Sequence, residues 1–331
     1  MKDIKDVSRR NWLRLSSLIF GATLIDIRAA GAIAPAFAKT PPLTPAEIAA
    51  IEAALGKKGT YKEAEATHHT PLPRNDLKVT LKGEPIPIPF GFGGWVAIKK
   101  TVDGKSAVLM SDAVLLHEEV NPLMTAAFEN GLEISAIHNH FFYEEPRIFY
   151  MHIHGTGTPE ELARKFSATI RGSKLSPANQ PQSISNSSVS TGKENFDLSA
   201  LDAIVKYTGV VNGPTYKYTV GRDDLIVRAM GAEMTPSIGL NSWASFVGRM
   251  EKAHIAGDIA MLEHEVNSVM RSLRRSEIEV VALHNHMLDD NPRMIFLHYL
   301  GTGPAVQLAQ GFRDALNQLG KGKSKVQGMH H

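Results

Sequence analysis

The segment Glu133-Ile-Ser-Ala-Ile-His-Asn-His140 and the following segment Arg147-Ile-Phe-Tyr-Met-His-Ile-His154 decide the fold of the first half of this chain. Both are rich in the β-branched and aromatic residues that favour strands. The residues between them, which include Pro146, are typical of a turn. The two segments therefore predict an antiparallel hairpin.

Helical patterns flank this hairpin. One helix is expected between Asn121-Pro122 and Asn130-Gly131, another over Glu160–Ile170, and an earlier one over Leu43–Leu55 with Thr44 as its N-cap. Further strands are expected at Leu77–Leu81, Trp95–Lys99 and Ala107–Leu116. Because helices and strands alternate but a hairpin is present, the pattern predicts an α+β fold, with a mixed or antiparallel sheet packed against helices.

The whole pattern occurs twice. The block His138-Asn139-His140 with Pro146-Arg147 and His152 returns as His284-Asn285-His286 with Pro292-Arg293 and His298. Trp95 and Trp243 also correspond, and we expect both in the core. The repeat predicts two tandem homologous domains, at 39–170 and 196–319. Residues 171–195, rich in Ser, Asn, Gln and Pro, predict a flexible linker, and residues 320–331 a disordered tail.

The N-terminus has the pattern of an export signal. Ser8-Arg-Arg-Asn-Trp-Leu-Arg14 contains an arginine pair followed by apolar residues, and Ala36-Phe37-Ala38 offers a cleavage site. Residues 1–38 are therefore predicted to be a twin-arginine signal peptide, with the twin-arginine export machinery as a partner. The apolar run between them is too short to span a membrane. We expect a periplasmic or secreted protein without stable membrane insertion after processing.

Composition narrows the classes of function. The 331-residue chain has a net charge of +2, with its basic residues dispersed, so a nucleic-acid partner is not expected. It contains no cysteine, which excludes disulfides, a thiolate metal site and lipid attachment through cysteine.

The histidines have the spacing of metal ligands. His138 and His140 are two residues apart, so in a strand they lie on one face, and the returning strand brings His152 and His154 beside them. If His140 lies opposite His152, His138 faces His154. Neutral imidazoles bind Zn, Mn, Fe or Cu, so a divalent transition metal is the expected cofactor. The predicted ligands are His138, His140, His152, His154, His284, His286 and His298.

A carboxylate is expected beside these histidines. Glu119 and its counterpart Glu265 precede the histidine blocks at strand ends and are the predicted catalytic general bases. Asp112 and Asp258 also correspond. Because Leu300 stands where the first copy has His154, the first copy is expected to have the richer site. Two other readings stay open: a structural polar cluster, and a pocket for an organic ligand or anion.

The combination of Ala-x-His-Asn-His, Pro-Arg with a later histidine, and a Gly-x-Gly ending resembles the bacterial secreted LppY/LpqO-like family, defined by a tandem domain of unknown function. The resemblance covers nearly the whole chain after the signal. It implies export and a two-copy architecture but supplies no reaction. The chain departs from the family's lipoproteins because it has no cysteine to lipidate.

The sequence therefore favours an exported periplasmic metal-binding protein, with metal-dependent hydrolysis as the activity to test. One alternative is a non-catalytic protein that binds metal or a small ligand. Another is an envelope interaction protein whose histidines stabilise the hairpins. The ligand, a small molecule or an envelope component, is not identified by the sequence, and whether the chain is an enzyme stays open.

Overall fold

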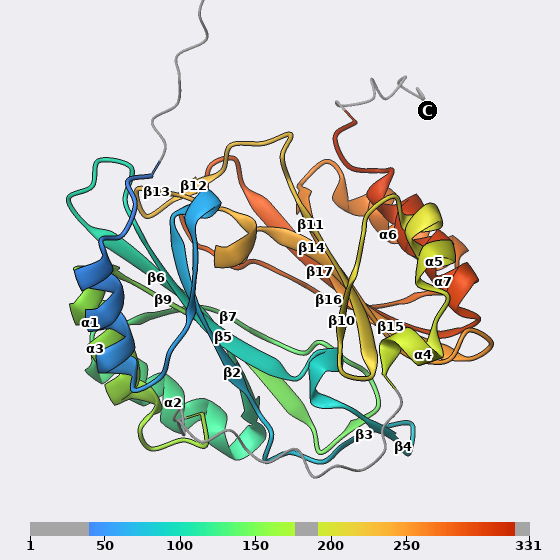
Figure 1. Cartoon of the computed structure of the whole chain (residues 1–331), viewed down its shortest axis with the longest axis horizontal. Coiled ribbons are helices and arrows are strands. Elements are labelled where there is room, and N and C mark those ends of the chain that lie inside the picture. Colours follow the sequence, from blue (N-terminus) through green and yellow to red (C-terminus); the bar gives the residue numbers. More distant parts are fainter. Residues whose placement is uncertain (1–39, 176–190, 322–331) are drawn as a thin grey trace, which may run out of the picture. The chain divides into compact units, whose positions relative to one another are not determined.

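Each repeat of the chain forms one six-stranded sheet covered by helices. Figure 1 shows the computed structural model, which describes residues 40–175 and 191–321. All strand pairings in these residues are antiparallel. The predicted α+β class with two tandem domains is confirmed, in its antiparallel form.

The first repeat contains the sheet β1-β2-β5-β6-β9-β7. Its strands are β1 (Thr60–Lys62), β2 (Thr67–Pro73), β5 (Gly93–Lys100), β6 (Ala107–Leu116), β7 (Glu133–His138) and β9 (Ile148–Gly157). A smaller sheet contains β3 (Val79–Leu81), β4 (Glu84–Ile86) and β8 (Glu144–Glu145). The helices are α1 (Pro45–Leu55), α2 (His117–Glu129) and α3 (Pro159–Ile170), with short 3-10 turns η1 (Glu63–Glu65) and η2 (Ile88–Phe90).

The second repeat has the equivalent sheet, β10-β11-β14-β15-β17-β16. Its strands are β10 (Val210–Asn212), β11 (Thr215–Gly221), β14 (Asn241–Gly248), β15 (Ala253–Leu262), β16 (Glu279–His284) and β17 (Met294–Gly303). A separate hairpin contains β12 (Arg228–Ala229) and β13 (Ala232–Glu233). The helices are α4 (Gly192–Asn195), α5 (Leu198–Val205), α6 (Val266–Arg275) and α7 (Ala305–Leu316), with the 3-10 turn η3 (Pro236–Ile238).

Local sequence explains where the helices begin. Thr44 and Thr158 each cap a helix that has proline at its first position, and a glutamate three residues after the cap completes a capping box. The helix expected at Asn121 instead begins four residues earlier, at His117, and contains Pro122. Glu119 accounts for the difference, because its carboxylate accepts a hydrogen bond from the Leu116 backbone nitrogen at 2.8 Å and caps the helix there.

The histidine hairpin forms, but in a different register from the one expected. His138 lies opposite Tyr150, and His152 lies opposite Ala136, with an irregularity in the pairing after Ile134. His140 lies beyond the end of β7. The pairing of His140 with His152 and of His138 with His154 is therefore wrong, because the strand ends before His140 and the irregularity shifts the register.

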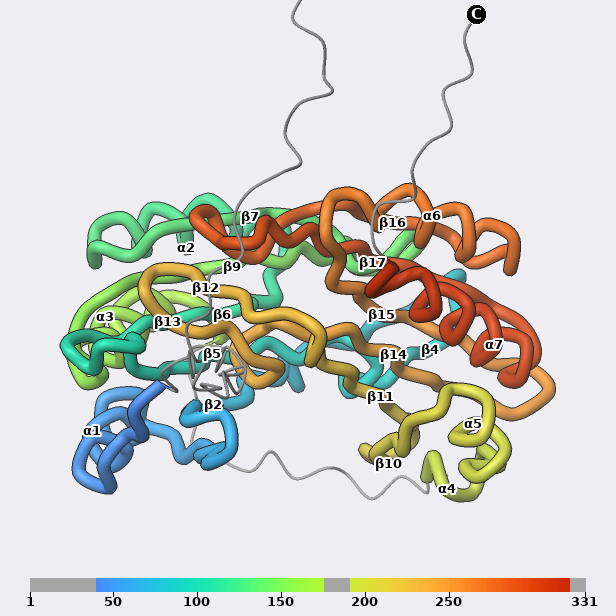
Figure 2. Tube along the Cα trace, turned by 90° about the horizontal axis from the view of Figure 1, so that it is seen from above, coloured from blue at the N-terminus to red at the C-terminus, as the bar shows by residue number. Residues whose placement is uncertain are grey.

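Two kinds of core hold the molecule together. One face of each sheet packs against that repeat's own helices, and these helices lie on opposite sides of the molecule in Figures 1 and 2. The other faces bring the repeats together: Met110 of the first packs in one cluster with Phe296 of the second, and Tyr150 in another with Leu300. The inner faces of the two sheets therefore pack against each other through these two clusters.

The predicted signal peptide (1–38) lies outside the described residues, as do most of the predicted linker (171–195) and most of the predicted tail (320–331). Helix α4 falls at the end of the linker range. The boundaries of the two repeat domains, 39–170 and 196–319, stay predictions. In the described part of the chain, no helix is both long and apolar enough to cross a membrane.

Candidate metal centre between the repeats

The inner face of each sheet carries a row of one tryptophan, one aspartate and one histidine. In the first repeat, Trp95 lies opposite Asp112, and Asp112 lies opposite His152. The second repeat has the same row, Trp243, Asp258 and His298. Since residues directly opposite one another point to the same face of an antiparallel sheet, each row presents a carboxylate next to an imidazole.

The His-Asn-His blocks lie at the ends of β7 and β16, where the asparagine fixes the local backbone. Asn139 donates from Nδ2 to the Ile148 carbonyl at 2.7 Å, within the first repeat. Asn285 donates to the Ser135 carbonyl of the first repeat at 2.9 Å. The asparagines thus hold backbone groups, and the histidines on either side of them lie together in the interior.

The six histidines of the two blocks and the two rows form one group, which we call the histidine cluster. Its close ring contacts join the repeats: His138 stacks on His284 with centroids 3.8 Å apart, and His140 on His298 at 3.7 Å. The rings of His152 and His286 are 4.1 Å apart. The structure therefore brings together six of the seven predicted histidine ligands, in one site rather than one site for each repeat.

Second partners orient several of these rings. Nδ1 of His298 lies 3.0 Å from the Gly257 carbonyl, Nδ1 of His152 3.3 Å from the Ser111 carbonyl, and Nδ1 of His286 2.9 Å from the Gly239 carbonyl. A proton on Nδ1 that bonds to a carbonyl leaves the Nε2 lone pair free, as in most histidines that bind metals. Nε2 of His152 and of His298 is buried and has no hydrogen-bond partner among the described residues.

Aromatic side chains hold the second histidine of each block. His140 stacks on Tyr150 with an interplanar angle of 6°, and His286 on Phe296 with an angle of 7°. Tyr150 is itself fixed by a hydrogen bond from its hydroxyl to the Gly91 carbonyl at 2.9 Å. These contacts restrict the ring orientations before any ligand binds, which lowers the entropic cost of binding.

Asp112 and Asp258 are the carboxylates that accompany the cluster. Oδ2 of Asp258 lies 3.3 Å from Nε2 of His286 and 3.9 Å from Nε2 of His298. Oδ2 of Asp112 lies 3.8 Å from Nε2 of His140. The other carboxylate oxygen of each aspartate is buried without a hydrogen-bond partner among the described residues.

Burial keeps the cluster histidines neutral. It lowers the pKa of all six, that of His286 to about 3 and that of His298 to about 4. Burial, followed by the charge of Asp258, raises the pKa of Asp112 to about 8, and burial also raises the pKa of Asp258. Neutral imidazole is the form that binds a metal ion, and the charge of a cation would favour ionisation of both aspartates.

Three sets of side chains in the cluster converge closely enough to hold an ion: His138 with His140 and His298; His138 with His152 and His284; and Asp258 with His284 and His286. In the first set, Nε2 of His138 and Nε2 of His140 are 3.2 Å apart. The first and third sets share no residue, whereas the second shares His138 with the first and His284 with the third. Each of the first two sets takes ligands from both repeats.

A cavity of about 740 Å³ gives access to the cluster. It is lined by His140, His152, His286, His298, Asp112 and Asp258, and by residues of both repeats that include Trp95 and Trp243. The two tryptophans were expected in the core, but both are partly exposed and lie in the cavity wall. The volume is that of a site for a small molecule.

His154, also a predicted ligand, lies outside these sets. Its side chain is buried, and Nδ1 lies 3.6 Å from the exposed carboxylate of Glu133. The expectation that His154 makes the first copy the richer site is therefore not met by the geometry. The reason is the register, which places His154 two residues along β9 from His152, opposite Glu133 rather than beside the His-Asn-His block.

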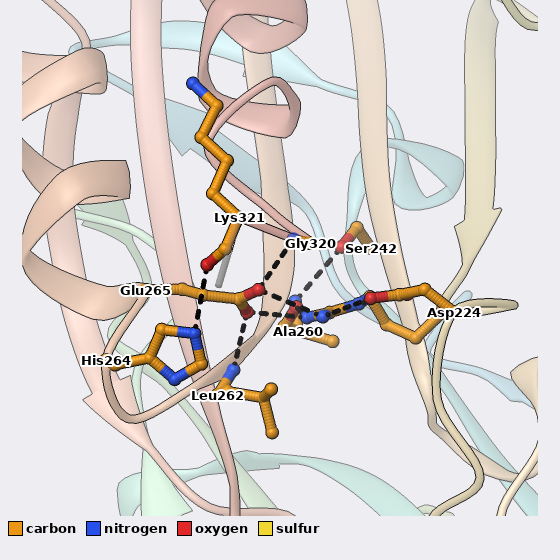
Figure 3. A network of polar contacts seen from close by, with 9 residues as sticks. Asp224, Ser242, Ala260, Leu262, His264, Glu265, Gly320 and Lys321 are labelled. Atoms are coloured by element: carbon orange, nitrogen blue, oxygen red, sulfur yellow. Dashed lines mark hydrogen bonds and ion pairs between the residues drawn. The ribbon is translucent and has the colours of Figure 1, made fainter. Parts of the chain in front are cut away.

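Glu119 and Glu265 hold arginines, not histidines. Glu119 accepts from Nη1 of Arg74 at 2.7 Å, and Glu265 from Nη1 of Arg222 at 2.8 Å. Figure 3 shows Glu265 in this network, where it also accepts from the backbone nitrogens of Leu262 and Gly320. Both carboxylates accept hydrogen bonds from a backbone nitrogen at the start of a helix and from a buried guanidinium. These groups all lie outside the histidine cluster.

The chain belongs to the family described as Domain of Unknown Function (DUF1259), whose model matches residues 49–171 and 199–318. The two matches coincide with the two repeats. No curated protein matches the chain.

Two solved structures are similar over much of the chain. A double-ringed trimeric shell protein from the RMM microcompartment is 9% identical, with 75% of this chain and 93% of that chain covered and a TM-score of 0.18. The trimeric bacterial microcompartment shell protein PduB is 13% identical, with 79% and 93% covered and a TM-score of 0.19. Scores this low carry no argument about fold or function.

Proposed function

We propose that the two repeats together form a transition-metal centre in the histidine cluster, and that the protein uses it to hydrolyse a small molecule bound in the cavity. The observation that carries the proposal is that side chains of the cluster converge in three sets closely enough to hold an ion. Several of its buried atoms also have no hydrogen-bond partner among the described residues: Nδ1 of His138, Nε2 of His152, Nε2 of His298 and Oδ1 of both aspartates. Buried polar atoms of this kind are costly unless something binds them.

The donor set favours Zn, Mn, Fe or Cu, because imidazole nitrogen with a carboxylate suits these ions. A bound ion would supply Lewis acidity and lower the pKa of a coordinated water. Asp112 and Asp258, which line the cavity beside the histidines, are placed to accept a proton there, and they take the role first assigned to Glu119 and Glu265.

The cavity favours hydrolysis over storage or a purely structural cluster. A structural or storage site is closed by its protein ligands, whereas a catalytic site keeps a position open to substrate. Here His140, His152, His286 and His298 line the cavity. Non-catalytic metal binding is the alternative that this proposal has to exclude.

Export is the second part of the proposal and rests on the sequence of residues 1–38 and on the likeness to the LppY/LpqO-like family. The twin-arginine machinery carries folded proteins, so an ion bound in the cytoplasm would travel inside the protein. A fusion of residues 1–38 to a reporter should reach the periplasm only when Arg9-Arg10 is intact. Delivery of an Arg9→Lys, Arg10→Lys fusion at the wild-type level would refute this route.

Elemental analysis of the untagged protein tests the metal centre. Wild-type protein, and a chain ending at Lys321 that lacks the His330-His331 pair, should contain one or two equivalents of a transition metal per chain. His298→Ala and His152→Ala should lower that content, whereas His117→Ala, which removes an exposed histidine outside the cluster, should not. Wild-type protein without stoichiometric metal would refute the proposal.

A panel of chromogenic esters, phosphoesters and amides then separates hydrolysis from storage. We expect metal-loaded protein to turn over one class, and Asp258→Asn to slow turnover by about 100-fold or more. Metal-loaded protein that hydrolyses none of these substrates would favour storage.

A further inference from the structure

The cavity wall contains a lysine that the metal centre does not use. Lys217 lies on β11, and its Nζ is 4.4 Å from the ring centroid of Trp243. Its side chain is partly buried, lines the cavity, and makes no ion pair or hydrogen bond with any described residue. A cation over a tryptophan ring gains about 0.5–2 kcal/mol, which orients the ammonium group but does not neutralise it.

The two halves of the cavity differ at this position. In the first repeat the residue equivalent to Lys217 is His69, whose ring stacks on Trp95 with centroids 5.6 Å apart. Burial, together with the charges of Lys62 and Lys217, lowers the pKa of His69 to about 4. All three side chains line the same cavity. The cavity is lined by equivalent strands of the two repeats, but it has the ammonium group of Lys217 on one side and the neutral ring of His69 on the other.

The remaining charges of the cavity leave this cation uncompensated. Glu65 is held by the backbone nitrogen and the hydroxyl of Ser237. Asp112 attracts Lys217 but makes no ion pair with it. If Asp112 serves the metal centre, its charge is shared with the ion. An anion brought by a ligand would then be the natural counter-charge for Lys217.

We propose that Lys217 binds an oxyanion of the ligand, a carboxylate or a phosphate group, and so orients the ligand between Trp243 and the histidine cluster. This rests on the proposed function for the identity of the reacting centre. The anion site itself rests on Lys217 and the cavity. On this proposal the ligand is a small organic molecule with a carboxylate or phosphate group, and the two halves of the cavity bind different parts of it.

Isothermal titration with benzoate and with inorganic phosphate tests this proposal on wild-type protein, Lys217→Gln and Lys217→Arg. The control is Lys82→Gln, because Lys82 also lies over an aromatic ring, 4.5 Å from the centroid of Tyr143, but does not line the cavity. We expect Lys217→Gln to weaken binding of the preferred anion by about tenfold or more, with Lys217→Arg and Lys82→Gln close to wild type. Preference for benzoate or for phosphate identifies which oxyanion the site accepts.

Metal content, measured on the same samples, separates the two proposals. Wild-type affinity in Lys217→Gln, or no binding of either anion to wild-type protein, would overturn the anion site even if metal is present. If the protein contains no stoichiometric metal but still binds an anion, and this binding depends on Lys217, the anion site is upheld and the metal centre is refuted.

Discussion

The imidazole rings of His138 and His284 stack face to face, with centroids 3.8 Å apart and planes 20° apart. These residues occupy the same position in the two repeats, at the ends of β7 and β16. Equivalent residues of the two repeats therefore contact each other inside the candidate site. Neither repeat contains a complete ligand set of its own in the two sets that include His138.

His154→Leu gives the first repeat the residue that the second already has at this position, Leu300. We expect the metal content to stay at the wild-type level and the free energy of unfolding to rise by about 1–2 kcal/mol, because a buried imidazole without a hydrogen bond is costly. Elemental analysis and urea unfolding measure both quantities. His152→Leu is the matched control, which should lower the metal content; loss of metal from His154→Leu would contradict the register in which His154 lies opposite Glu133.

Glu265→Ala removes one of the two acidic partners of the buried Arg222. The side chains of Arg222 and Glu265 are 2% and 1% exposed, so removal of this carboxylate should cost about 3 kcal/mol of unfolding free energy, even though Arg222 keeps its ion pair with Asp224. Arg74 likewise keeps its ion pair with Asp76 in Glu119→Ala, but this variant should cost less, because the side chain of Glu119 is 13% exposed and its ion pair is closer to solvent. Thermal or urea unfolding measures the difference.

The conservative variants Glu119→Gln and Glu265→Gln test the role first expected of these residues. We predict wild-type metal content and wild-type turnover in the folded fraction of each. A folded Glu119→Gln or Glu265→Gln protein that has lost activity but kept its stability would restore the glutamates as general bases.

Lys99 is a fully buried cation whose Nζ has one weak contact, 3.5 Å to Oγ1 of Thr235. Burial lowers its pKa from 10.5 to about 8. At pH 7 the ammonium is charged in both the folded and the unfolded protein, and its burial destabilises the folded state. Lys99→Met should therefore raise the free energy of unfolding by about 1–3 kcal/mol at that pH.

The sign of the pH dependence follows from the lowered pKa of Lys99. Between pH 8 and 10.5 the unfolded chain still binds a proton that the folded protein has released, so wild-type stability rises relative to Lys99→Met and the difference disappears near pH 10.5. Lys100→Met is the control on the same strand and should destabilise, because Lys100 pairs with Glu47 at 2.9 Å. A pH-independent difference for Lys99→Met would contradict this reading.

Periodicity and duplication in the sequence predict the fold class, the hairpin and the cap at Thr44, because these depend on residues close together in the chain. The register of β7 against β9 could not be predicted, since it depends on an irregularity that alternation does not encode. Nor could the start of α2, where Glu119 replaces Asn121 as the capping residue.

The candidate site was predictable in its histidines but not in its assembly. The ring of His140 stacks on His298 of the other repeat and not on His152. This contact depends on how one repeat packs on the other. Asp112 and Asp258 were recognisable as equivalent residues, and the strand pairing of Trp95, Asp112 and His152 would have placed the carboxylate correctly had the register been known. Lys217 has no sequence signal, because its counterpart His69 differs in chemistry.

Anomalous scattering from crystals of the untagged protein, recorded on both sides of the absorption edge of the metal found by elemental analysis, tests the shared metal centre most directly. We predict an anomalous peak inside the histidine cluster, coordinated by imidazoles of both repeats, with His298 of the second repeat beside His138 and His140 of the first. No peak in the cluster, or one whose ligands all come from a single repeat, would contradict a centre built by the two repeats together.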